Sequence, residues 1–141
     1  MTRFNPTTPQ PFLDRRAAGR ELAAELLHYA GREDVVIVAL PRGGVPVAYE
    51  VARALKAPLD IFLVRKLGFP GHAELAMGAI ASGNVRILNH DLVDTYRVPS
   101  QAIEDIARQE GIELERREQL YRAGRPALSL ANRGVILIDD G

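Results

Sequence analysis

The sequence predicts an α/β fold with a mostly parallel sheet and an inserted β-hairpin. Two short runs of aliphatic and β-branched residues, at 35–40 and 135–138, are typical of buried strands in a parallel sheet, and a further strand is predicted at 59–64. A helix pattern lies between the segments at 35–40 and 59–64, and a strand, a helix and a strand in succession form a βαβ unit with parallel strands. The hairpin is indicated by two apolar segments that flank Ser82-Gly83-Asn84.

The first helix is expected to start at Arg15. Residues 1–11 carry three prolines and little apolar content, so we expect an N-terminal arm that precedes a domain at 12–141. Asp14 can cap the helix, and Gly31 is a suitable stop. The apolar residues between them recur at helical spacing, which predicts a packing element: Ala18, Leu22, Ala23, Leu26, Leu27, Tyr29 and Ala30.

A glycine-containing turn follows the first predicted strand. Residues 35–40 form the strand, the turn is Pro41-Arg42-Gly43-Gly44, and Pro46 suits the first turn of a helix that reaches about Leu55. Pro58 ends that segment. The next strand is predicted at 59–64 and closes on Arg65-Lys66.

The second half of the chain is predicted to hold a hairpin and two helices. Residues 67–74 contain Gly68, Pro70 and Gly71, and we interpret them as an exposed, mobile loop. Hairpin strands are expected at 77–81 and 85–89, and a short helix at 90–97. A long helix follows from Ser100, its predicted cap, to about Arg122, and Gly111 is expected to weaken it.

Composition excludes several functional classes. The 141 residues contain 18 Lys and Arg against 18 Asp and Glu, so net charge favours neither nucleic acid nor an anionic membrane. Without cysteine, there is no disulfide framework, thiolate metal site or thiol nucleophile. Because no apolar run is long enough to span a membrane and the start is unlike a signal peptide, we expect a cytoplasmic protein.

Three groups of residues could carry chemistry, and each has an ordinary structural alternative. Arg42, Gly43 and Gly44, between a strand and a helix N-terminus, suit an anion-binding loop or a tight turn with an exposed arginine. Arg65-Lys66 suits a phosphate or a solvated strand end. Asp139-Asp140 suits vicinal hydroxyls, a hydrated Mg²⁺, or a turn with capping acids. Glu74 is a weaker candidate in the predicted loop.

Taken together, the chain resembles the type I phosphoribosyltransferase family, and in particular a bacterial branch of predicted members. Five stretches carry the resemblance in the right order: FLDRRAAG at 12–19, LPRGGVPVA at 40–48, VRKLG at 64–68, ELAMGAI at 74–80 and VILIDDG at 135–141. The resemblance implies a Rossmann-like fold. It also implies transfer of a 5-phosphoribosyl group from phosphoribosyl pyrophosphate to a nitrogenous base, with release of pyrophosphate and assistance from Mg²⁺.

The same resemblance implies a role for each candidate residue. Arg42-Gly43-Gly44 matches the loop that contacts pyrophosphate, where family members often hold a non-proline cis peptide, and Arg65 and Lys66 would lie beside it. Asp139 and Asp140, the candidate catalytic pair, match the acids that hydrogen-bond the ribose hydroxyls, and Gly141 continues that motif. Residues 67–80, with Gly68 and Glu74, correspond to a flexible region that can close over the site. No residue is assigned directly to a metal.

The printed sequence ends at Gly141, inside the phosphoribosyl pyrophosphate motif of the family. We therefore expect a C-terminally truncated version of the fold, without the loop that holds the 5′-phosphate, and reduced or absent catalysis. Missing sheet neighbours also predict a homo-oligomer. The alternative is a non-catalytic domain that binds a phosphorylated ligand or serves in regulation or assembly.

Overall fold

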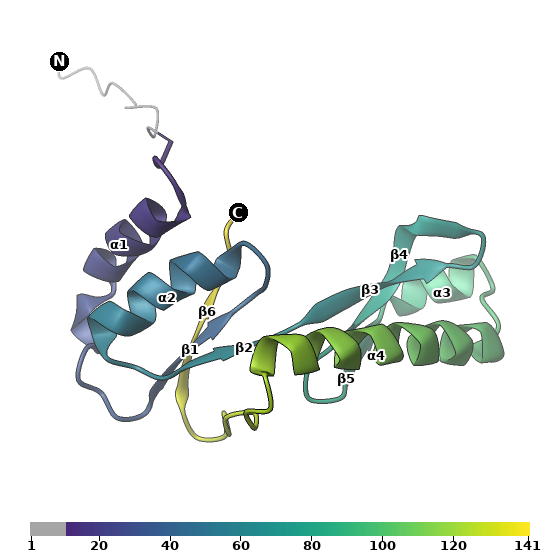
Figure 1. Ribbon diagram of the computed structural model, residues 1–141. Helices are drawn as coiled ribbons and strands as arrows, with labels where there is room; N and C mark the ends of the chain where they lie inside the picture. The colour runs from purple at the N-terminus through teal and green to yellow at the C-terminus, as the bar shows by residue number, and fades with distance from the viewer. Residues whose placement is uncertain (1–10) are drawn as a thin grey trace, which may run out of the picture.

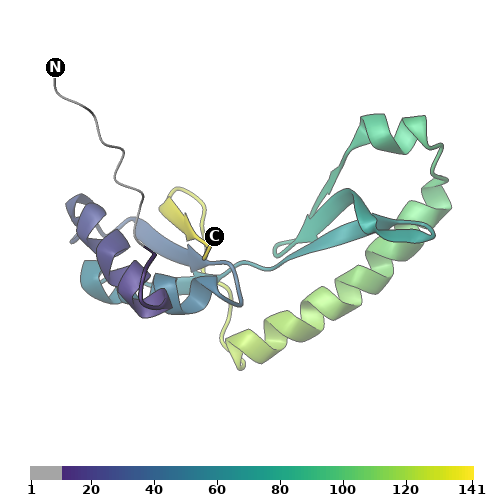
Figure 2. The same cartoon turned by 90° about the horizontal axis from the view of Figure 1, so that it is seen from above.

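The computed structural model describes residues 11–141, which form two lobes side by side (Figures 1 and 2). The first lobe holds a three-stranded parallel sheet in the order β2-β1-β6, and the second a three-stranded antiparallel sheet in the order β3-β4-β5. The predicted α/β class, with a parallel sheet and an inserted hairpin, is confirmed. The hairpin belongs to a larger antiparallel sheet than the sequence indicated.

The parallel lobe combines β1 (Val35–Ala39), β2 (Leu59–Ile61) and β6 (Gly134–Ile138) with α1 (Arg15–Glu25) and α2 (Gly44–Leu55). A short 3-10 helix, η1 (Leu27–Tyr29), follows α1. Asp14 caps α1 as predicted, since its Oδ1 accepts a hydrogen bond from the Ala17 amide at 2.7 Å. α1 packs on α2, and α2 packs on the sheet through apolar side chains such as Val47, Val51 and Leu55.

Burial differs between the two strands that position the site. All five residues of β1 are buried, which confirms a strand covered on both faces. The same expectation for β6 is wrong, because Val135 and Leu137 are 43% and 56% exposed. β6 lies at the edge of the three-stranded sheet. Within the described part of the chain, only the face of β6 that carries Ile136 and Ile138 packs into the core with α1 and α2.

The second lobe combines β3 (Val64–Phe69), β4 (His72–Ala81) and β5 (Val85–Leu88) with α3 (His90–Thr95) and α4 (Ser100–Arg122). Its core lies between the sheet and α4, where Leu67 and Met77 are fully buried against Ile103, Ala107 and Leu114. α4 runs through Gly111 without a break, and its N-cap is Pro99, so the predicted Ser100 cap is wrong. The predicted β4–β5 hairpin and the short helix α3 are confirmed.

Two boundaries differ from the sequence prediction. The strand expected at 59–64 ends at Ile61, and Val64 begins a strand of the other sheet. The loop expected at 67–74 is instead a second hairpin, because β3 continues to Phe69 and β4 starts at His72. Gly71, at φ +78°, forms the turn that joins the two strands. Gly68, which suggested a loop, lies instead within β3 at an irregularity in its pairing with β4.

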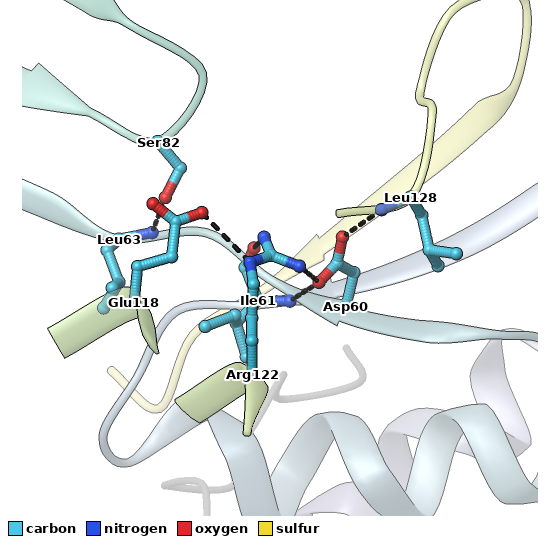
Figure 3. Close-up of polar contacts among 7 residues, drawn as sticks. All are labelled: Asp60, Ile61, Leu63, Ser82, Glu118, Arg122 and Leu128. Carbon is cyan, nitrogen blue, oxygen red and sulfur yellow. Dashed lines mark hydrogen bonds and ion pairs between the residues drawn. The ribbon is translucent and has the colours of Figure 1, made fainter. Parts of the chain in front are cut away.

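A group of polar contacts joins the two lobes (Figure 3). Asp60 of β2 accepts hydrogen bonds from the Arg122 guanidinium at 2.5 Å and from the Leu128 amide at 2.9 Å. Arg122 ends α4, and both its side chain and that of Asp60 are nearly buried, at 12% and 11% exposure. Nearby, the buried Ser82 hydroxyl accepts the Leu63 amide at 2.9 Å. These hydrogen bonds fix the segment that passes from β2 to β3 and the segment that leads from α4 back to β6.

The substitution Arg122→Met keeps side-chain length but removes the charge. We expect the free energy of unfolding, measured by urea denaturation, to fall by roughly 3 kcal/mol, because Asp60 is left nearly buried without its partner. Arg117→Met on the same helix is the matched control, since Arg117 and its partner Glu113 are 50% and 31% exposed. It should cost less than about 1 kcal/mol. Equal losses would show that the lobes do not depend on the Asp60–Arg122 pair.

Candidate functional site

The glycine loop leaves β1 at the carboxyl edge of the parallel sheet. The Leu40 amide donates to the Ile138 carbonyl at 2.9 Å, which extends the β1–β6 ladder into the loop. The Pro41–Arg42 peptide bond is cis, as the resemblance implied. The amides of Gly44 and Val45 donate to Leu40 and Arg42 carbonyls at 3.1 and 3.3 Å. Within residues 11–141, the amides of Arg42 and Gly43 have no such acceptor, so they are the candidate loop donors for an anion.

Both glycines of the loop touch the end of β6. A Cβ built on Gly43 would lie 1.7 Å from Oδ2 of Asp140, and one built on Gly44 would lie 2.7 Å from the Ile138 carbonyl oxygen. Only residues without a side chain let the loop and the strand end approach this closely. The carboxyl ends of β1 and β6 therefore bring Arg42-Gly43-Gly44 and Asp139-Asp140 together at one sheet edge.

A third element, α1, reaches the same place through Arg15. Its Nε and one terminal nitrogen donate to Oδ2 of Asp140 at 3.0 and 2.9 Å. These hydrogen bonds lower the pKa of the Asp140 carboxyl below its usual range. The backbone amide of Asp140 donates to Oδ1 of Asp139 at 2.8 Å, so the two acids are tied to each other as well.

Arg15 was not predicted as a site residue. It lies 125 positions from Asp140, and nothing in its local pattern distinguishes it from the adjacent Arg16. The one sequence signal was its place in the FLDRRAAG stretch, which was recognised as part of the resemblance without a role for any of its residues.

A cleft of about 1090 Å³ opens beside the acid pair. Its walls are the segment at 11–14, one side of α1 and the two aspartates. Acidic side chains predominate among the charged residues that line it: Asp14, Glu21, Glu25, Asp139 and Asp140, with Arg15. The cleft gives a ligand of moderate size access to the carboxylates.

Arg65 and Lys66 do not join this site. They belong to β3, where their Cα partners are Ile80 and Ala79 of β4. Arg65 also donates to Glu110 of α4 at 2.5 Å, so its charge is already paired. The prediction placed them at the carboxyl end of the second parallel strand, and it fails because that strand ends at Ile61 and the chain crosses to the other sheet.

The remaining candidates occupy different parts of the structure. Gly68 lies in β3 and Glu74 in β4, so neither belongs to the predicted loop, and Glu74 lies 3.6 Å from the His72 ring nitrogen. Gly141 follows the acid pair and is exposed. Residues 11–141 hold no group of three or more His, Cys, Asp or Glu arranged for a metal ion. None of the helices in this range is long and apolar enough to cross a membrane.

The charge of Asp140 should respond to Arg15. In Arg15→Met, we expect the pKa of Asp140 to rise toward the usual value of an aspartate, because the hydrogen bonds that favour the carboxylate are gone. A folded pKa below the unfolded one stabilises the protein above the unfolded pKa, and that contribution is lost as pH falls through the folded pKa. Carboxyl ¹³C NMR titration of the unsubstituted chain and of Arg15→Met measures the Asp140 pKa in each. An equal pKa in the two would show that Arg15 and Asp140 do not pair in solution.

Comparison with known proteins identifies the family. The model of the phosphoribosyl transferase domain matches residues 12–141. Two proteins of Mycobacterium tuberculosis, from strains CDC 1551 / Oshkosh and ATCC 25618 / H37Rv and both named "Putative phosphoribosyl transferase", are 48% identical over 130 residues. That match covers 92% of this chain but 29% of each relative.

A solved structure agrees with the family match. The crystal structure of protein TT1426 from Thermus thermophilus superposes with a TM-score of 0.75 at 42% identity. It is matched over 93% of this chain and 62% of its own, so the chain spans only part of each of these relatives. With a family match over nearly its whole length, this chain belongs to the phosphoribosyl transferase domain family.

Proposed function

We propose that this domain binds phosphoribosyl pyrophosphate at the carboxyl edge of the parallel sheet and transfers its 5-phosphoribosyl group to a nitrogenous base. The observation that supports the proposal is the contact of Gly43 with Asp140, because it brings the glycine loop directly beside a carboxylate pair. A ligand with a pyrophosphate next to ribose hydroxyls could place its pyrophosphate at the glycine loop and its hydroxyls at the carboxylates. The acceptor base and the activity of the whole protein are part of the proposal.

In this reaction the bond between ribose C1 and the pyrophosphate oxygen breaks, and the pyrophosphate leaves with the electron pair. A bond forms between C1 and a nitrogen of the base, which afterwards loses a proton to solvent. Arg42 and the amides of Arg42 and Gly43 would offset charge on the leaving pyrophosphate. Asp139 and Asp140 would accept hydrogen bonds from the ribose hydroxyls and hold the ring in place.

Mg²⁺ is expected to accompany the donor, and it would neutralise part of the pyrophosphate charge. The residues at the site fit this use. Two adjacent exposed carboxylates offer too few oxygens for a cage built by the protein alone, but Mg²⁺ commonly keeps several waters and binds through substrate phosphates. We assign no side chain as a direct ligand. A cytoplasmic location and self-association remain predictions.

Pyrophosphate binding tests the loop. In Arg42→Ala, we expect the affinity for inorganic pyrophosphate, measured by isothermal titration calorimetry with Mg²⁺, to fall roughly tenfold, as for loss of a hydrogen bond to a charged group. Glu74→Ala should leave the affinity unchanged, because Glu74 lies in β4 of the other sheet. Equal effects of the two substitutions would contradict the assignment of the loop.

Turnover distinguishes catalysis from binding alone. Catalysis is measured as the release of pyrophosphate and the formation of a nucleotide on incubation with phosphoribosyl pyrophosphate, Mg²⁺ and a panel of bases. The double substitution Asp139→Asn and Asp140→Asn should abolish the release, because amides hold the ribose hydroxyls less strongly than carboxylates. Tight donor binding without any release would favour the alternative, a non-catalytic domain that binds a phosphorylated ligand.

A further inference from the structure

Asp140 lies outside any helix or strand, so no regular backbone structure fixes it. It lies beyond Asp139, which follows the last residue of β6, its side chain is 31% exposed, and its nearest charged neighbour in the chain is another carboxylate. Two adjacent carboxylates repel each other, which favours rotation of one of them into solvent. For either acid to serve as a fixed acceptor, something must offset that repulsion.

Arg15 holds one oxygen of Asp140 and leaves the other open. Both of its hydrogen bonds go to Oδ2, which is also the oxygen nearest to the Cβ built on Gly43. Within residues 11–141, no side chain other than Arg15 donates a hydrogen bond to Asp140, and its Oδ1 lies 2.8 Å from the Cβ position built on Gly43. A carboxylate fixed in this way presents a single free oxygen in a defined direction, which suits one hydroxyl donor.

We propose that Arg15 is a positioning residue for the donor site: it fixes Oδ2 of Asp140 against the glycine loop so that Oδ1 accepts a hydrogen bond from a ribose hydroxyl. This inference rests on the proposed function, and it adds an element, α1, that the sheet edge alone does not supply. Arg15 acts on the ligand only through Asp140.

Stability of the fold does not depend on this pair. α1 is held by close packing on α2, where a Cβ built on Gly19 would lie 2.7 Å from the Val47 carbonyl oxygen and where Ala23 is buried. The Arg15 side chain is 60% exposed, and exposed ion pairs contribute little to stability. Arg15 variants should therefore fold, which circular dichroism and thermal melting can verify.

The experiment compares two ligands that differ by a ribose 5-phosphate. Affinities for phosphoribosyl pyrophosphate and for inorganic pyrophosphate are measured by calorimetry at the same Mg²⁺ concentration, and the ratio of the first affinity to the second gives the contribution of the ribose 5-phosphate. In Arg15→Met we expect the ratio to fall roughly three- to tenfold, the value of about one hydrogen bond. Arg15→Lys, which can still donate to Oδ2, should restore part of it. Arg16→Met, an equal loss of charge one residue along, should leave the ratio unchanged.

A double substitution shows whether the effect passes through Asp140. In an Asp140→Asn background, Arg15→Met should change the ratio less than about twofold, because the oriented carboxylate is already gone. An equal effect in both backgrounds, or an unchanged ratio in Arg15→Met, would overturn the positioning role while the proposed function stands. If the unsubstituted chain binds neither ligand, the donor site itself fails, and this inference fails with it.

Discussion

The parallel pairing of β1 with β6 fixes the relative position of the loop Arg42-Gly43-Gly44 and the acid pair Asp139-Asp140. Five residue pairs, from Val35 with Gly134 to Ala39 with Ile138, bring the two strand ends level. The glycine loop and the acid pair leave those ends together, so their contact follows from register and not from any attraction between them. A shift of one residue would move Asp140 away from Gly43 and turn Ile136 and Ile138 out of the core. Burial of those two side chains therefore selects the register that creates the site.

The second lobe contributes to this register from a distance. Asp60 accepts the Arg122 guanidinium with one oxygen and the Leu128 amide with the other, at the start of the segment that returns to β6. One side chain thus joins the end of α4, strand β2 and the approach to the last strand (Figure 3). The antiparallel sheet and α4 have their own core, so the loop-and-acid site does not need their side chains. The site depends on the second lobe only because the length of α4 and its attachment to β2 determine where the chain re-enters the parallel sheet.

Local patterns predicted the elements whose formation depends on neighbouring residues. The apolar run of β1, the helix after Pro46 and the turn at Ser82-Gly83-Asn84 all have strong short-range signals. The division between β2 and β3 has none, because the mostly apolar segment from Leu59 to Val64 does not show which sheet each residue joins. Gly68, Pro70 and Gly71 indicate a loop from local sequence, and only pairing with β4 makes the segment up to Phe69 a strand. Arg15 was missed for the same reason, since its role depends on a contact with the opposite end of the chain.

The corrected position of Arg65 and Lys66 changes the electrostatics of the proposed site. Four cationic side chains would have been expected to act there if both had joined Arg42 and Arg15, against the two aspartates. With Arg65 paired to Glu110 and Lys66 in β3, Arg15 is the cation that contacts the acid pair, and it is already engaged by Asp140. Three more acids, Asp14, Glu21 and Glu25, line the cleft beside the pair. A site in which acids predominate attracts a free anion weakly, so a pyrophosphate must rely on Arg42, the loop amides and a cation that it brings itself. This charge distribution favours a ligand that offers hydroxyl donors to the acids as well as phosphate oxygens to the loop. Selectivity for a phosphorylated sugar over simple phosphates would then come from the carboxylates, which repel any anion that lacks the hydroxyls to engage them.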